Sequence, residues 1–398
     1  MDRRAYWLWL QHAFPAGSHK PKSIFNRYNN LKEFYEGGPS KWASLSFLTD
    51  NDLTLLASYN INQAKATLEY CENMDMRVIC PECADYPEAL WNIKDPPAVL
   101  YVRGEMPDFD ANLSIAVVGS RKTSELSLKT AEEICYNLSK EEVIIVSGGA
   151  VGIDTAAHKG ALMGIAPTVA VLGCGLEFPY LLENELLRQK IVSKGGALIT
   201  EYPPSMGVTK GTFQARNRII SGLANGTLIV SAEKKSGTMI TARRAIEQNK
   251  ALFAVPGNPM LPTSEGPNSL IKDGATPVTS YMDIMEYYAC VKTKDIENKE
   301  ETVQLLLDEL IEPKAKNNEN TLGCSDYKDK IISQFGLSLA AKVLVEALEF
   351  EPLHISRISE KTALCAQEIL SVATELELLD IIVAYSGQRY AINNNIIL

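Results

Sequence analysis

The fold of this chain is decided by the stretch IAVVGSRKTSELSLKTAEEICYNLSKEEVIIVS, residues 115–147. It begins with the apolar run Ile115–Val118, continues into the amphipathic pattern Ser127–Leu138, and ends in a second apolar run, Val143–Ser147. Such short apolar runs are typical of strands that are buried on both faces, and a helix between two of them makes the strands parallel. The stretch therefore predicts a strand–helix–strand unit.

The same alternation continues as far as residue 255. Four further apolar runs are Thr168–Leu172, Ala197–Thr200, Thr227–Ser231 and Ala251–Val255. The helical patterns between the runs are Thr155–Met163, Leu181–Ser193, Ala215–Leu223 and Ile240–Gln248. Two shorter runs, Arg77–Cys80 and Ala98–Val102, come earlier in the chain. This repetition predicts an α/β fold with a doubly wound, mainly parallel sheet and helices on both faces.

Changes in composition divide the chain into four parts. Residues 1–75 carry apolar side chains at helical spacing in three patterns, Trp7–Ala13, Ile24–Phe34 and Leu53–Cys71. We expect a small helical module, similar to SAM or helix-hairpin-helix modules, with its aromatic residues in a small core. Residues 76–290 form the α/β domain, and residues 291–325 form a charged linker. Residues 326–398 show three helical patterns and a hairpin, which is typical of a winged-helix-like domain. Its third helix is acidic, which favours contact with protein over contact with DNA.

The charge of the chain is unevenly distributed. The 398 residues have a net charge of −10, which argues against a protein that is basic throughout. Residues 210–250 hold eight Lys or Arg and two acids, a local charge of +6, so the rest of the chain carries −16. A basic face on an acidic body suits a polyanion site.

Targeting and metal signals are weak in this sequence. No apolar segment approaches the roughly 18 residues that cross a membrane, and the first residues do not resemble a signal peptide, so we expect a cytoplasmic protein with no membrane partner. Cys80 and Cys83 form a CxxC pair without a second pair. We therefore favour reduced thiols over a zinc or redox site.

The sequence KGTFQARNR, residues 210–218, is the leading candidate for a binding site. Lys210, Arg216 and Arg218 provide charges that suit phosphate oxygens, and no acid lies among them. The ring of Phe213 offers a face on which an unpaired base could stack. A loop-to-helix junction after the fourth strand of the alternation places this stretch at the carboxyl edge of the sheet.

Small residues follow several strands at the same edge. They occur in Gly119-Ser120-Arg121 after the first strand, Gly148-Gly149 after the second, and Ser236-Gly237-Thr238 after the fifth. Ligands of doubly wound sheets bind beyond the carboxyl ends of the strands, and small residues let backbone amides approach an anion. We expect these loops and residues 210–218 to line one rim.

The common nucleotide fingerprints are absent. GxGxxG does not follow the first strand, and GxxxxGK[ST] does not occur, which disfavours NAD, FAD and ATP hydrolysis. No GxSxG or HExxH is present. His158 is better explained as a structural residue beneath the sheet edge than as a catalytic one.

Several motifs in the same order resemble the DprA/Smf family of DNA-processing proteins. The matching stretches are GSRKTS (119–124), SGGAVGIDTAAH (147–158), GTFQARNRIISGL (211–223), SAEKKSGTMITARRA (231–245), AVPGNP (254–259) and PNSLIKDGA (267–275). The chain departs from many relatives at Val151, where they have arginine, and at Ser231-Ala232-Glu233, where they have Glu-Ala.

The resemblance implies a Rossmann-like domain that binds single-stranded DNA without reading its bases. It also implies a homodimer that protects incoming DNA in natural transformation and loads the RecA recombinase, with no cofactor and no enzymatic reaction. By motif position Arg121 grips a phosphate and Ser236-Gly237-Thr238 forms an amide pocket. The full set of expected DNA contacts is Gly119, Ser120, Arg121, Gly148, Gly149, Lys210, Phe213, Arg216, Asn217, Arg218, Lys234, Ser236, Gly237, Thr238 and Asn268.

Two alternatives stay open. A nucleotide phosphoribohydrolase of the lysine-decarboxylase-like type has a similar sheet, but its motif PGGxGTxxE requires a glutamate where this chain has Thr241. An interaction scaffold with a solvated basic face is the other alternative.

Overall fold

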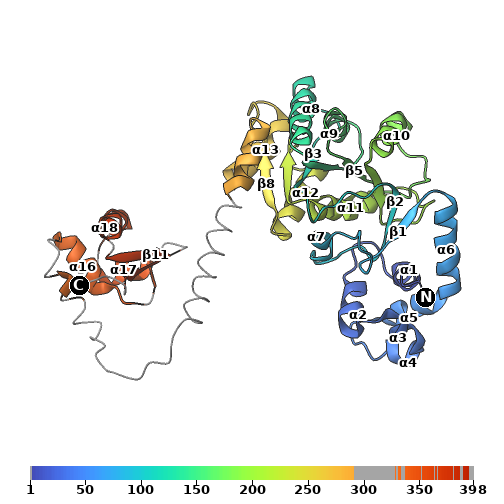
Figure 1. Ribbon diagram of the computed structural model, residues 1–398, viewed down its shortest axis with the longest axis horizontal. Coiled ribbons are helices and arrows are strands. Elements are labelled where there is room, and N and C mark those ends of the chain that lie inside the picture. Colours follow the sequence, from blue (N-terminus) through green and yellow to red (C-terminus); the bar gives the residue numbers. More distant parts are fainter. Residues whose placement is uncertain are drawn as a thin grey trace. The chain divides into compact units, whose positions relative to one another are not determined.

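A computed structural model gives the fold (Figure 1) and describes residues 2–290, 328, 330–332, 337–350, 352–362, 364, 366–379, 381–385 and 389–393. These residues form two compact units, one before residue 300 and one after it. The predicted linker, residues 291–325, lies outside the described residues. Within the described part of the chain, no helix has the length and apolar character needed to cross a membrane.

A nine-stranded sheet forms the centre of the first unit. Its spatial order is β1-β2-β6-β5-β4-β3-β7-β8-β9. The strands from β3 to β9 pair in parallel, while β1 and β2 pair antiparallel at one edge. Their bounds are β1 Arg77–Ile79, β2 Leu100–Gly104, β3 Ser114–Val118, β4 Ile144–Ser147, β5 Thr168–Val171, β6 Ala197–Thr200, β7 Gly226–Ile229, β8 Ala251–Ala254 and β9 Thr276–Pro277. The predicted mainly parallel sheet is confirmed.

Helices cover both faces of the sheet, as a doubly wound fold requires (Figure 1). One face carries α8 (Glu125–Lys140), α9 (Ile153–Ala161) and α10 (Glu185–Ser193), which follows the short helix η1 (Leu182–Asn184). The other face carries α7 (Glu88–Trp91), α11 (Lys210–Leu223), α12 (Gly237–Glu247) and α13 (Pro262–Lys272). The winding changes direction between the adjacent strands β3 and β7, which opens a crevice at their carboxyl ends.

Helix α11 begins five residues earlier than its apolar pattern predicts. Thr209 caps it: the amide of Thr212 donates to the Thr209 hydroxyl over 3.2 Å, and the Thr209 amide donates to the Thr212 hydroxyl over 3.1 Å. Gly211 and Thr212 are poor helix formers, so the pattern alone placed the start at Ala215. The stretch 210–218 is therefore entirely helical.

The helical module contains six helices where three patterns were expected. They are α1 Arg4–Ala13, α2 Lys20–Tyr28, α3 Leu31–Glu36, α4 Gly38–Trp42, α5 Asp50–Ser58 and α6 Ile61–Asn73. Asn29 in the left-handed conformation and the cap residue Asn60 divide two of the expected helices. The predicted aromatic core is present, and it continues into Val78, Val99 and Tyr101. The module therefore packs on the β1–β2 edge of the sheet.

The second unit has the predicted sequence of helices and hairpin. Its elements are α16 Leu339–Ala347, β10 Leu353–His354, α17 Ile355–Thr362, α18 Ala366–Leu378, β11 Ile382–Tyr385 and β12 Arg389–Ile392. The three strands pair antiparallel in the order β10-β12-β11. A separate apolar core joins the helices to this small sheet.

Replacing Trp9 by alanine tests the core of the helical module. Trp9 is fully buried, and its indole nitrogen donates to the carbonyl oxygen of Leu56 over 2.9 Å. We expect Trp9→Ala to lower the free energy of unfolding by about 3–5 kcal/mol in urea titrations. Leu186→Ala, at a side chain that is 73% exposed, should change it by less than about 0.5 kcal/mol. Equal values for the two variants would contradict this core.

Candidate nucleic-acid interface

A cavity of about 290 Å³ lies at the crevice between β3 and β7. The amide of Ser120, after β3, donates to the carbonyl oxygen of Ser231, after β7, over 2.8 Å and so fixes the two loops to each other. The cavity is lined by Val118, Gly119, Ser120, Arg121, Ala150, Asp154, Phe213, Arg216, Asn217, Ile220, Ser236, Gly237, Thr238 and Thr241. Nine of the residues expected from the sequence therefore lie together.

Two glycines of the loop after β4 allow the floor of the cavity to close. Gly152 has a φ of +84°, and a Cβ there would lie 2.4 Å from the carbonyl oxygen of Ser120. A Cβ on Gly148 would lie 2.8 Å from Nη1 of Arg216. Gly148 and its neighbour Gly149 do not line the cavity; Gly148 packs against Arg216, which does.

Arg216 forms part of the floor and is only 5% exposed. Its Nη1 donates to the carbonyl oxygens of Gly148, over 2.7 Å, and of Val171. Burial lowers the pKa of Arg216 and raises the pKa of Asp154, and in each case the opposite charge of the other residue limits the shift. Arg216 therefore contributes positive charge at a fixed place.

Phe213 lies between this floor and the exposed Arg121. The guanidinium carbon of Arg121 is 5.0 Å from the centre of the ring, and that of Arg216 is 5.9 Å from it. Tyr180 packs against the same ring with the centroids 5.5 Å apart. A base that stacks on Phe213 must share the ring with Arg121 or displace its exposed guanidinium group.

The N-terminus of α12 is a third part of the site. Ser236 is the cap residue, yet its hydroxyl makes no cap hydrogen bond and is buried without a partner among the described residues. A Cβ on Gly237 would meet only open space. Free amides and the positive end of the helix dipole suit an anion at this position.

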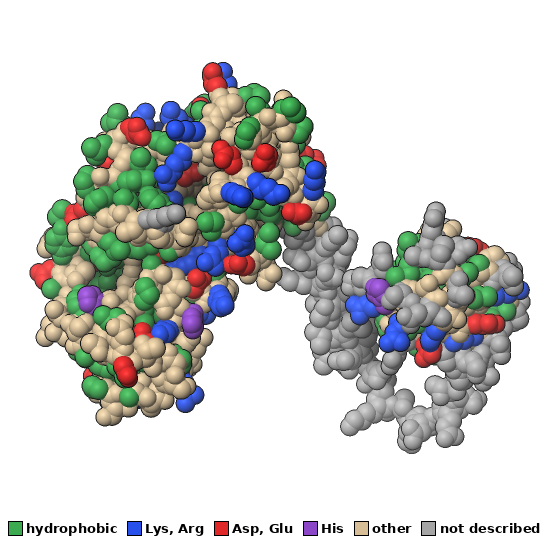
Figure 2. Space-filling model, turned by 180° about the vertical axis from the view of Figure 1, so that it is seen from behind, with side chains coloured by type: hydrophobic (Ala, Val, Ile, Leu, Met, Phe, Trp, Pro, Cys, Tyr) green, Lys and Arg blue, Asp and Glu red, His purple; other side chains and the backbone are tan. Residues whose placement is uncertain are grey.

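A second hollow of about 600 Å³ continues from the first. The two share Phe213, Asn217, Ser236 and Gly237, and we call them together the groove. The second hollow adds the exposed side chains Lys234 and Lys235. It also adds Arg243, one helical turn from Met239 on the same face of α12. Figure 2 shows Lys and Arg side chains gathered on the sheet part of this unit and sparse over the helical module.

Lys235 and Arg243 were missed as site residues. Both belong to the basic segment 210–250, but a count of charges does not show which face of a helix is exposed. The sequence did contain a signal for Arg243: it follows Met239 by four residues, in the helix that begins after the cap residue Ser236, and residues four apart lie on the same face of a helix. That spacing places Arg243 above the first turn of α12.

Arg218 corrects the expectation of a phosphate contact. It is 1% exposed, its Nη2 donates to Oε2 of Glu201 over 2.6 Å, and its Nε lies 3.5 Å from Oδ2 of Asp95. Arg218 is two residues after Arg216, and residues two apart point to different sides of a helix, so the two side chains leave α11 in different directions. Arg218 therefore anchors α11 to the end of β6 and does not reach the groove.

One more expected contact, Asn268, does not line the groove, and the side chain of another, Lys210, is not described. The side chain of Asn268 donates to the carbonyl oxygen of Gly257 over 2.9 Å and accepts from its amide over 3.1 Å, so it holds the loop after β8. The side chain of Lys210 lies outside what the structure describes, although its backbone belongs to α11.

His158 and the cysteine pair lie apart from the groove. His158 is fully buried, its Nδ1 is 2.8 Å from the Thr168 hydroxyl, and burial lowers its pKa to about 3. Its burial apart from the groove agrees with the structural role expected from the sequence. The sulfurs of Cys80 and Cys83 are 3.4 Å apart as free thiols, and the contact with Cys80 lowers the pKa of Cys83 to about 7. The described residues contain no cluster of three metal-ligating side chains.

Replacing Arg218 tests its anchoring role. In Arg218→Ala the carboxylate of Glu201 stays buried without its partner, so we expect a loss of about 3–5 kcal/mol of unfolding free energy in urea titrations. Arg244→Ala breaks an exposed pair with Glu247 and should cost less than about 1 kcal/mol. A small loss for Arg218→Ala would contradict the anchor.

The same variant has a defined pH dependence. Burial raises the pKa of Glu201 in the folded protein, and Arg218 limits that rise. A carboxyl group with a raised folded pKa destabilises the protein as the pH rises from its unfolded value, about 4.3, through the folded value. Removing Arg218 raises the folded pKa of Glu201 further and so widens the pH range over which this carboxyl group destabilises the protein. The difference in stability between wild type and Arg218→Ala should therefore be larger at pH 7 than at pH 5, and a difference independent of pH would contradict the assignment.

Comparisons with known proteins identify relatives along the whole chain. The family described as DNA recombination-mediator protein A matches residues 77–289. Protein Smf of Synechocystis is 31% identical over 396 residues, covering 98% of each chain. The DNA processing protein DprA of Streptococcus pneumoniae is 40% identical over 200 residues, which is 50% of this chain and 70% of that protein.

One solved structure of a relative shares this fold. The crystal structure of S. pneumoniae DprA superposes with a TM-score of 0.61 at 30% identity, covering 71% of this chain and 97% of that one. A structure of DprA from Helicobacter pylori, reported for its single-stranded DNA binding mode, covers 54% of this chain and 95% of that one at 30% identity, with a TM-score of 0.49. The family match, the full-length similarity to Smf and the shared fold together show that this chain belongs to the DprA/Smf family of DNA-processing proteins.

Proposed function

We propose that this chain binds single-stranded DNA along the groove, through phosphates and base stacking. The observation that supports this most directly is the pairing of two features in one continuous groove. One is the N-terminus of α12, with the unpartnered Ser236 hydroxyl. The other is the Phe213 ring under Arg121. The first suits a phosphate and the second suits a base, which are the two repeating parts of a nucleic-acid strand.

The length of the groove favours a polymer over a mononucleotide. Arg121 lies at the first hollow, while Lys235 and Arg243 lie at the second, so exposed cations recur along its course. The side-chain amide of Asn217 accepts from Nε of Arg216 and donates to the carbonyl oxygen of Gly237, so part of its hydrogen-bonding capacity is used within the protein, while the exposed cations suit phosphates. Binding therefore depends little on base sequence.

The position of Phe213 favours a single strand over a duplex. Its ring is half-buried at the junction of the two hollows. A paired base presents only its edges in the grooves of a duplex, whereas an unpaired base can turn its face to an aromatic ring.

The family adds a cellular context to this binding. We infer from the family description, a recombination mediator, that the bound strand is passed to a recombinase, and RecA is the partner that the family resemblance implies. Protection of incoming DNA in natural transformation, a homodimer and a cytoplasmic location are parts of the same proposal.

A nucleotide hydrolase is the less favoured function. Its motif requires a glutamate at position 241, where Thr241 lines the cavity. The carboxylate of that cavity, Asp154, is buried beside Arg216 and accepts from the amide of Ala150 over 3.4 Å. We therefore propose binding without catalysis.

Removing one exposed cation tests the phosphate contacts. We expect Arg121→Ala and Lys235→Ala each to weaken the affinity for an oligothymidylate and to reduce the slope of log K against log salt by about 0.7, the value for one phosphate contact on a single strand. Fluorescence anisotropy in a salt series measures both. Lys129→Ala, at an exposed lysine of α8 outside the groove, is the matched control. Wild-type affinity and slope in both groove variants would exclude this site.

Replacing the ring of Phe213 tests base stacking. We expect Phe213→Ala to cost about 1–3 kcal/mol of binding free energy, and Phe213→Tyr, which keeps the aromatic face, to bind nearly as well as wild type. Titrations at one fixed salt concentration measure the difference. If Phe213→Tyr and Phe213→Ala bind equally weakly, the ring has a packing role and does not stack on a base.

A further inference from the structure

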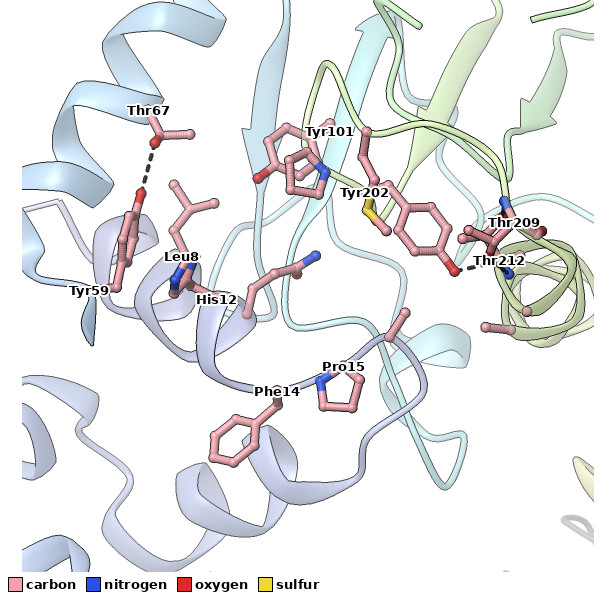
Figure 3. Close-up of a pocket in the computed structure, with 16 residues that line it drawn as sticks. Leu8, His12, Phe14, Pro15, Tyr59, Thr67, Tyr101, Tyr202, Thr209 and Thr212 are labelled. Carbon is pink, nitrogen blue, oxygen red and sulfur yellow. Dashed lines mark hydrogen bonds between the residues drawn. The ribbon is translucent and has the colours of Figure 1, made fainter. Parts of the chain in front are cut away.

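A larger pocket of about 660 Å³ lies beside the first turns of α11, between the helical module and the sheet (Figure 3). Its walls come from α1 and Tyr59 on the module side, and from Tyr101, Tyr202 and the start of α11 on the sheet side. No Asp, Glu, Lys or Arg occurs among the described residues that line it. The described part of the lining is therefore uncharged, with apolar and aromatic side chains.

One polar group at the wall of this pocket makes no hydrogen bond among the described residues. Tyr101 is 2% exposed, and its hydroxyl makes no hydrogen bond within the described residues. Figure 3 shows this hydroxyl directed toward the side of the pocket where Leu8, His12 and Tyr59 lie. Burial raises the pKa of Tyr101, so the hydroxyl stays protonated and can donate. A hydroxyl that makes no hydrogen bond within the described residues and faces the pocket can donate to an acceptor on a ligand.

The module side of the pocket provides a flat aromatic face. The ring of His12 stacks on Tyr59, with the centroids 4.2 Å apart and the planes 18° from parallel. The hydroxyl of Tyr59 is 2.8 Å from that of Thr67, which holds the stack to α6. His12 is an exposed residue. A planar ring could stack there, and bases stack on histidine as on other aromatic residues.

The remaining polar groups around the pocket narrow the ligand further. Gln11 is already engaged, because it accepts from the amide of Val99 over 3.1 Å and donates to the carbonyl oxygen of Glu201. The N-terminal turn of α11 faces the pocket at Gly211, and helix N-termini attract anions. The ligand would combine an uncharged ring, an acceptor for Tyr101 and an adjacent anionic group.

We propose that this pocket takes one unpaired nucleobase of the DNA strand, with the neighbouring phosphate at the N-terminus of α11. This inference rests on the proposed function, because it requires a strand in the groove. Helix α11 is the wall between the two sites: Phe213 and Asn217 face the groove, while Gly211 and Thr212 face the pocket. A strand that crosses the first turn of α11 passes from one to the other. Base carbonyl oxygens and ring nitrogens supply the acceptor for Tyr101.

Two variants test the pocket without touching the groove. Tyr101→Phe removes only the hydroxyl, and we expect a 3- to 10-fold loss of affinity for an oligothymidylate, on the order of one neutral hydrogen bond. His12→Ala removes the stacking face. Because His12 is exposed, we expect this variant to fold like wild type and to lose about 5-fold or more in affinity for the oligothymidylate. Tyr136→Phe, on α8 away from the pocket, is the matched control and should bind like wild type.

An abasic scan of the oligothymidylate separates a base in the pocket from an indirect effect. In the wild-type protein we expect an abasic site at the position that occupies the pocket to weaken binding. This position differs from the one that stacks on Phe213, whose abasic loss should disappear in Phe213→Ala. In His12→Ala the abasic loss at the pocket position should disappear instead. Wild-type affinity in both Tyr101→Phe and His12→Ala, or an abasic loss of equal size in wild type and His12→Ala, would overturn the proposal. Either result leaves the groove intact. If Arg121→Ala and Lys235→Ala also bind like wild type, the proposed function itself fails.

Discussion

Two buried arginines fix helix α11, and the site depends on where that helix lies. Arg216 donates to the carbonyl oxygens of Gly148 and Val171, at the ends of β4 and β5. Arg218 pairs with Glu201 at the end of β6. A guanidinium group carries five donors in a rigid plane, so each arginine holds a fixed orientation against the groups that it binds. Between them they hold α11 to three neighbouring strands, and Phe213 is placed by that attachment.

The cations of the basic segment therefore have two different tasks. A buried charge requires partners within the protein, because its transfer from water is costly, and such partners leave little for a ligand. Exposed charges such as Arg121, Lys235 and Arg243 keep their hydration and can exchange it for phosphate oxygens on binding. An acidic protein can thus bind a polyanion locally while its remaining surface repels one.

Much of the fold could be predicted from the sequence, because strands buried on both faces read as short apolar runs regardless of what packs on them. The start of α11 could not, since Thr209 caps it through a side-chain exchange with Thr212 that a hydrophobic pattern does not record. The roles of Arg216 and Arg218 were also hidden. A sequence shows that two arginines lie two residues apart, but Glu201, the partner that buries Arg218, is distant in the chain and comes close only in the folded sheet.

The groove and the pocket beside Tyr101 show how far functional sites could be predicted from the sequence. Loop residues after β3 and β7 were expected at one rim because parallel strands end at one edge, and they do lie together. No sequence motif indicated the pocket at the Tyr101 hydroxyl, because this pocket forms only when the helical module packs against β2. Sites between two packed parts arise from tertiary contacts that no local motif specifies.

The most direct measurement is a comparison of single-stranded and duplex DNA of equal length in one salt series, by anisotropy with the full-length protein. We expect the single strand to bind more tightly at every salt concentration, with log K falling linearly as log salt rises and little difference between base compositions. Equal affinity for the duplex, or an affinity for the single strand that does not change with salt, would contradict binding through phosphates and unpaired bases in this groove.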